Sequence, residues 1–151
     1  MRIYLDNCCY NRPYDDQSDL KISIETQAKI KIQNLIVNKE LELATSYVLR
    51  TENSRNTVES KRENINNYID ENTTVYVDIK HFEEIDREAE AIIASGIKYM
   101  DACHVACAKF ADCDYFISTD RRLLRYKDEK ISLVDPIEFI DILNDSIAEE
   151  K

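Results

Sequence analysis

Residues 101–120, DACHVACAKFADCDYFISTD, carry the clearest structural pattern in the chain. The first half is rich in Ala and Cys and predicts a helix over Asp101–Phe110. The second half predicts a short buried strand, Tyr115–Ser118, which ends in Thr119 and Asp120. Together they predict one helix–strand unit of a domain in which helices cover a sheet.

The rest of the chain repeats this alternation of helices and strands. Strands are predicted at Arg2–Leu5, Leu41–Thr45, Val75–Val77, Tyr115–Ser118 and Ile131–Val134. Helices are predicted from a Ser18 or Asp19 cap to about Asn38, at Tyr47–Arg55, Val58–Ile69, His81–Ala94 and Asp101–Phe110, and from Pro136 onward. Gly96, the only glycine, falls where a glycine commonly ends a helix. The alternation predicts a three-layer α/β domain with a mostly parallel central sheet of four to five strands flanked by helices.

The composition fits one domain of this kind. The chain has 151 residues, and 44% of them are hydrophobic, which is enough for one core. One glycine and two prolines are too few for the many tight turns of an all-β sandwich. We expect a single domain over residues 1–147, with residues 148–151 as a flexible tail.

Charge and cysteine content narrow the class of protein further. The formal net charge of −10 argues against a protein that simply coats DNA, so any contact with nucleic acid should be local or metal-mediated. Solubility explains the acidity equally well. Five cysteines, two of them adjacent at Cys8 and Cys9, make a poor disulfide framework. With neither an apolar leader nor a membrane-span pattern, the sequence predicts a cytoplasmic protein.

Four acidic residues stand out by their positions. Asp6 follows the first strand, and Asp120 follows the strand Tyr115–Ser118, so both should lie at the sheet edge where parallel strands end. Asp101 opens its predicted helix, and Glu52 lies about two turns into the helix after the second strand. Singly, Asp120 is explained as a helix cap, Asp101 by the helix dipole and Glu52 as an exposed residue.

Taken together, the four acids predict a metal site. Clustered carboxylates repel one another, and at least one must take up a proton unless a cation lies among them. Mg²⁺ and Mn²⁺ prefer carboxylate and water oxygens, and they can activate a water beside a phosphate. Phosphodiester cleavage is therefore the reaction that such a cluster favours.

Four segments resemble the PIN-domain family over nearly the whole chain. They are IYLDNC (3–8), TSYVLRTEN (45–53), MDACHVACA (100–108) and YFISTDRRLL (115–124). The resemblance implies that the family's acidic catalytic and metal-binding residues are Asp6, Glu52, Asp101 and Asp120. It implies a PIN-like fold and a Mg²⁺- or Mn²⁺-dependent endoribonuclease that cuts single-stranded RNA in the cytoplasm. It also implies a toxin with an antitoxin partner, and a homodimer.

Other residues are candidates for supporting roles. Thr119 looks like the hydroxyl residue beside such acid clusters, and Asn7 could orient Asp6 or a metal-bound water; a strand-end hydrogen bond and a turn are the ordinary explanations. Arg50 and Arg121 are the best-placed cations for RNA phosphates, or else ordinary surface charges. His104, which lies between Cys103 and Cys107, gives only a weak zinc pattern.

Two alternative functions remain open from the sequence. A PIN-like domain could bind RNA or a partner protein without cutting. A signalling domain of the receiver type would also be an acidic α/β protein with Asp at strand ends. The receiver class needs a Lys after its last strand, however, and here Asp135 and Pro136 follow the last predicted strand.

Overall fold

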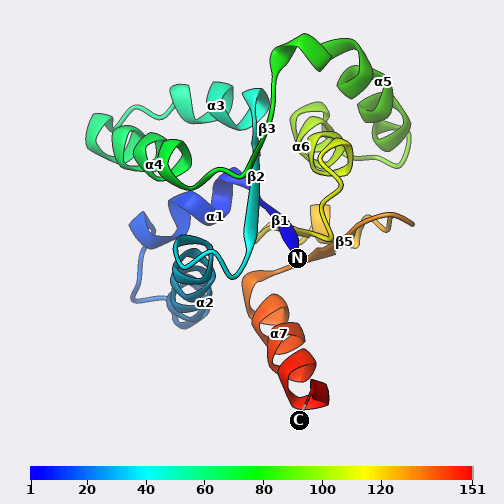
Figure 1. Cartoon of the computed structure of the whole chain (residues 1–151). Helices are drawn as coiled ribbons and strands as arrows, with labels where there is room; N and C mark the ends of the chain where they lie inside the picture. The colour runs from blue at the N-terminus through cyan, green and yellow to red at the C-terminus, as the bar shows by residue number, and fades with distance from the viewer. Residues whose placement is uncertain (151) are drawn as a thin grey trace.

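The computed structural model describes residues 1–150, with side chains for residues 1–147, and is built on one parallel sheet. Its strands are β1 (Arg2–Leu5), β2 (Glu42–Ser46), β3 (Val75–Val77), β4 (Tyr115–Ile117) and β5 (Ser132–Val134). They lie in the order β3-β2-β1-β4-β5, and every neighbouring pair is parallel. The α/β class and the five-stranded parallel sheet are thereby confirmed (Figure 1).

Helices occupy the connections between the strands. They are α1 (Asn7–Asn11), α2 (Leu20–Val37), α3 (Tyr47–Ser54), α4 (Glu59–Asn72), α5 (Phe82–Ile93), α6 (Tyr99–Phe110) and α7 (Pro136–Glu150). Short 3₁₀ turns are η1 (Arg12–Tyr14), η2 (Ile79–His81) and η3 (Leu123–Arg125). The predicted flexible tail, residues 148–151, falls outside the described side chains.

One predicted boundary was wrong in a way that affects the site. Helix α6 begins at Tyr99, so Asp101 lies within its first turn and does not open it. Asp120 is followed by the 3₁₀ turn η3. Gly96 lies just past the end of α5 with φ at 92°, as expected for a glycine that ends a helix.

Alternation along β1 explains the three layers. Ile3 and Leu5 face the cluster formed with α1, α2, α4 and α7, whereas Tyr4 faces the cluster formed with α5 and α6. Ile3, Tyr4 and Leu5 are all fully buried, as expected for a central strand covered on both faces. Figure 1 shows α5 and α6 on one side of the sheet and α2 and α4 on the other.

The strand order fixes where a ligand site can form. β1 has β2 on one side and β4 on the other, so the chain crosses to opposite halves of the sheet from this central strand. The crevice at the carboxyl end of such a switch point is the usual ligand site of a parallel sheet. Receiver-type domains have the order 2-1-3-4-5, so this order overturns that alternative.

The helices also bear on membrane association and capping. Within residues 1–150, no helix is both long enough and apolar enough to cross a membrane. Ser46 caps α3, because its Oγ accepts the N–H of Leu49 at 3.1 Å. The cap fixes the start of α3 at the end of β2, and so fixes the direction in which Glu52 is presented.

Candidate active site

Asp6 is held rigidly at the switch point. It is the first residue after β1, and the residue is buried, with 5% of its surface exposed. Its Oδ1 accepts the backbone N–H of Asn7 at 2.8 Å, and its Oδ2 accepts the hydroxyl of Ser118 at 2.8 Å. Because Ser118 follows β4, groups from two adjacent strands set the orientation of one carboxylate.

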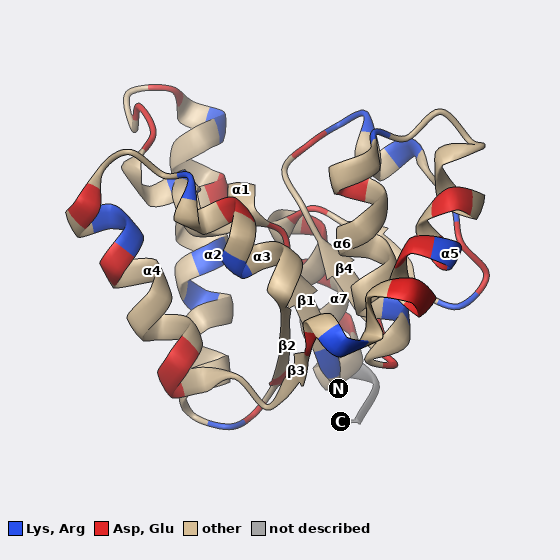
Figure 2. Cartoon of the chain, turned by 90° about the horizontal axis from the view of Figure 1, so that it is seen from above, with Lys and Arg blue, Asp and Glu red and all other residues tan. Residues whose placement is uncertain are grey.

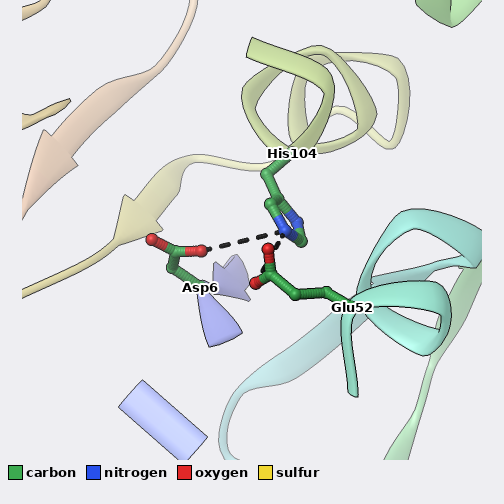
Figure 3. A group of neighbouring side chains, drawn as sticks. All are labelled: Asp6, Glu52 and His104. Atoms are coloured by element: carbon green, nitrogen blue, oxygen red, sulfur yellow. Dashed lines mark ion pairs between the residues drawn. The ribbon is translucent and has the colours of Figure 1, made fainter. Parts of the chain in front are cut away.

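Glu52 approaches Asp6 from α3, which follows β2 and so lies on the opposite side of β1 from β4 and Ser118 (Figure 3). Its side chain is partly buried, with 28% of its surface exposed. Burial alone would raise the pKa of Glu52, but polar contact with His104, the charge of His104 and an Asn7 contact together lower it. Glu52 therefore remains an anion beside Asp6.

His104 joins the two carboxylates from α6. The imidazole is fully buried, and its Nε2 lies 3.4 Å from Glu52 Oε1 and 4.0 Å from Asp6 Oδ1. One ligand atom from each of the three residues lies within 4.8 Å of the others. Burial lowers the pKa of His104, yet contact with Glu52 and the charges of the nearby acids raise it overall.

A second set of contacts fixes the histidine ring. His104 Nδ1 lies 2.7 Å from the Tyr4 hydroxyl, which in turn lies 2.6 Å from Ser46 Oγ. Tyr4 and Ser46 are fully buried, and Ser46 also caps α3. This chain of polar groups orients Nε2 toward the acids, as partners behind a metal-binding histidine commonly do.

The imidazole nitrogen that faces the acids lacks a well-aligned hydrogen-bond partner. Among the described residues, His104 Nε2 is a buried polar atom with no hydrogen bond. An unsatisfied buried nitrogen is costly unless a proton shared with the acids or a cation satisfies it. The two carboxylates and this nitrogen therefore fit the donor set of a divalent metal ion.

Asp101 and Asp120 lie next to this group. Burial, followed by the charges of Asp6 and Asp120, raises the pKa of Asp101 to about 6. Asp120 Oδ1 accepts the N–H groups of Arg122 at 2.9 Å and Leu123 at 3.4 Å, so it stabilises the turn that leads into η3. Both acids line one cavity of about 540 Å³.

The supporting residues make different contacts. Thr119 is buried, and its N–H donates to Cys8 Sγ at 3.3 Å. Arg50 is paired with Asp70 and also contacts Asn66 on α4. Arg121 Nη1 lies 3.3 Å from Asp135 Oδ2 and 4.0 Å from Glu138 Oε1. All five cysteines are free thiols, as their spacing predicted.

The sequence analysis missed His104 and Ser118 as site residues. His104 follows Asp101 by three positions on one helix, a spacing that places two side chains on the same face. That spacing is a signal by which His104 could have been predicted as a site residue, but the only pattern considered for it was a zinc site with Cys103 and Cys107. Ser118 was taken only as the end of a strand, and its bond to Asp6 depends on the pairing of β1 with β4.

Comparison with known proteins identifies the fold. Neither the models of known families nor the curated proteins gave a match to this chain. FitAcB from Neisseria gonorrhoeae is similar in structure, with a TM-score of 0.55 and 11% identity over 89% of this chain and 98% of that one. A structure of FitAB bound to an IR36 DNA fragment has a TM-score of 0.53 and 13% identity over 89% of this chain and 94% of that one. At these identities the likeness concerns the fold alone, and it confirms the predicted PIN-like fold.

Proposed function

We propose that this chain is a metal-dependent endoribonuclease that hydrolyses phosphodiester bonds of single-stranded RNA. The catalytic and metal-binding acids of the proposal are Asp6, Glu52, Asp101 and Asp120. The observation that carries it is the buried group of Asp6, Glu52 and His104, whose ligand atoms lie within 4.8 Å at the switch point of a parallel sheet. The PIN-like fold supports the same function.

Asp6, Glu52 and His104 would hold the ion directly, and Asp101 and Asp120 would bind it directly or through water. Mn²⁺ and Mg²⁺ are the two candidates, and the imidazole favours Mn²⁺, because Mg²⁺ keeps to oxygen ligands. When bound, such an ion lowers the pKa of a water molecule and holds a phosphate oxygen. Without an ion, a protonated His104 is the cation that offsets Asp6 and Glu52.

The chain's own residues support this chemistry by position. The hydrogen bonds from Asn7 and Ser118 hold the Asp6 carboxylate in one orientation, and immobile acceptors lose little energy in reorganising as a reaction proceeds. Glu52 is the residue that either binds the ion or positions the attacking water. Asp101 and Asp120 face the adjoining cavity, where they can orient a water or a phosphate-bound cation.

We also propose a partner protein for this domain. The resemblance to the PIN-domain family implies the role of toxin in a toxin–antitoxin pair, and FitAB, a protein of the same fold, is bound to a DNA fragment in its structure. A second copy of the chain is the other proposed partner. Co-purification with the product of a neighbouring open reading frame would support the antitoxin, whereas purification alone as an active dimer would contradict it.

The decisive experiment is cleavage of a defined single-stranded RNA in Mn²⁺, in Mg²⁺ and in EDTA. We expect cleavage in Mn²⁺, none in EDTA, and a loss of at least about 100-fold in Asp6→Asn. Asp141→Asn on α7 removes one exposed carboxylate away from the group and should cleave like the parent. Equal cleavage by parent and Asp6→Asn would reject the proposal. RNA binding without cleavage would favour the alternative of a non-catalytic PIN-like domain.

A further inference from the structure

A basic cavity adjoins the acidic group on the α6 side. It lies between the turn of residues 95–98, before α6, and the segment of residues 120–127, after β4. Its cationic lining residues are Lys98, Arg122, Arg125 and Lys127. The cavity measures about 540 Å³ and also includes Asp101 and Asp120, so it is continuous with the proposed catalytic residues. We call it the basic cavity below.

The four cations of the basic cavity are free of ionic partners. All four are exposed, and within the described part of the chain none of them takes part in an ion pair. Arg50 and Arg121, by contrast, are each engaged with a carboxylate. In a chain of net charge −10, four unpaired cations around one hollow indicate a surface that receives an anion.

The adjoining acids restrict the kind of anion. An acidic protein segment that entered the basic cavity would bring its carboxylates against Asp101 and Asp120, and like charges repel. A phosphodiester strand avoids this conflict, since most of its charges can lie on the cations while one phosphate shares a metal ion with the acids. The turn offers room as well, because nothing lies within 4 Å of the position that a side chain at Gly96 would occupy.

We propose that the basic cavity holds the RNA phosphates that adjoin the bond to be cut. The RNA strand then approaches the acidic group from the α6 side, and not from the side of α3, the helix that carries Arg50. Figure 2 shows α4 and α5 on opposite sides of the molecule, with α3 beside α4 and α6 beside α5. This inference rests on the proposed function and identifies how its substrate is bound. Arg122 and Arg125 are positioning residues, and Arg50 and Arg121 have structural roles.

The test is the salt dependence of RNA binding. A short fluorescein-labelled single-stranded RNA is titrated with Asp6→Asn protein, which should not cut it, from about 0.05 to 0.3 M NaCl. Each lost phosphate contact should lower the slope of log K against log[salt] by about 0.7, which corresponds to roughly fivefold in affinity at 0.1 M salt. We expect Arg122→Ala/Arg125→Ala to bind roughly 25-fold more weakly.

Matched controls separate this effect from a general loss of charge. Lys31→Ala/Lys80→Ala removes two exposed cations from α2 and η2, outside the basic cavity, and should leave the slope unchanged. Arg122→Lys/Arg125→Lys keeps the charge and should restore most of the affinity. An unchanged thermal unfolding midpoint shows that the alanine variant is folded.

The outcomes distinguish this inference from the proposed function. If the parent cuts RNA and Arg122→Ala/Arg125→Ala binds and cuts it equally well, the inference is wrong and the nuclease proposal stands. If RNA binds with the expected slope change but is never cut, the inference stands and the nuclease proposal fails. Absence of RNA binding at the lowest salt overturns the inference, and absence of cleavage as well overturns both.

Discussion

On the α3–α4 side of the acidic group, polar side chains are used to hold two helices together. Arg50 is paired with Asp70, and the buried Asn53 donates to the carbonyl of Arg62 at 3.1 Å and to Asn66 Oδ1 at 3.0 Å. On the α6 side, the cations of the basic cavity are free of such contacts. Arg50 is close in sequence to Glu52, a proposed ligand, yet it is paired and so is not available to a substrate. Closeness in sequence to a site residue is therefore a poor guide to which cations can bind the substrate.

The largest effect is expected from a substitution of His104, the residue that α6 contributes to the proposed metal group. Mn²⁺ at about 100 times its Kd should stabilise the parent by about 2.7 kcal/mol. In His104→Gln, a Kd weakened by about 100-fold would reduce this gain to about 0.4 kcal/mol. Urea unfolding with and without Mn²⁺ measures the change. His81→Gln alters the other histidine and should keep the full gain; equal gains in both variants would exclude His104 from the group.

The next effect tests the structural role of the α3–α4 side. Asn53→Ala removes a fully buried amide that donates to the carbonyl of Arg62 and to Asn66 Oδ1. We expect the free energy of unfolding to fall by about 2 kcal/mol. RNA cleavage per folded molecule should change little, as judged by activity at a temperature well below the unfolding midpoint. A loss of activity without a loss of stability would contradict the division between the two sides.

A smaller effect concerns pH and Asp101. Its folded pKa of about 6 exceeds that of an unfolded Asp, so the metal-free native state binds more protons between about pH 4 and 6. Stability should therefore fall as pH rises through this window, and Asp101→Asn should abolish that contribution.

Because the Asp101 carboxyl is half-exposed, solvent screening reduces its contribution to the free energy of unfolding to about 1 kcal/mol. The stability of Asp101→Asn relative to the parent should rise by that amount between about pH 4 and 7.5, measured in EDTA by urea unfolding. A constant difference across this range would show that Asp101 does not share its environment with the other acids.

The smallest effect sharpens the contrast between the arginines. Arg50→Ala breaks a pair in which Asp70 is 59% exposed, so we expect a loss of less than about 1 kcal/mol. Its affinity for single-stranded RNA, measured by fluorescence anisotropy, should equal that of the parent. If Arg50→Ala lowered the slope of log K against log[salt] by as much per arginine as Arg122→Ala/Arg125→Ala, RNA would have to lie on both sides of the acidic group.

Periodicity and local signals predicted most of the fold. The strand Arg2–Leu5 was predicted as the structure has it, and Asp19, one of the two caps considered before α2, is the cap in the structure. These features depend on residues within a few positions of one another, and so the sequence alone reveals them. The start of α6 was predicted two residues late because Tyr99 and Met100 carry no distinctive capping pattern.

The α/β class, the apolar strands and the acids that follow them could be predicted from the sequence alone. The folded chain shows that His104, and not a further acid, completes the group with Asp6 and Glu52. Which arginines are free also depends on the fold, since Arg50 pairs with Asp70 across two helices and Arg121 pairs with Asp135, which follows β5. Ion pairs and buried side chains form between segments that are far apart in the chain. Local sequence patterns carry no information about the distance in space between such segments.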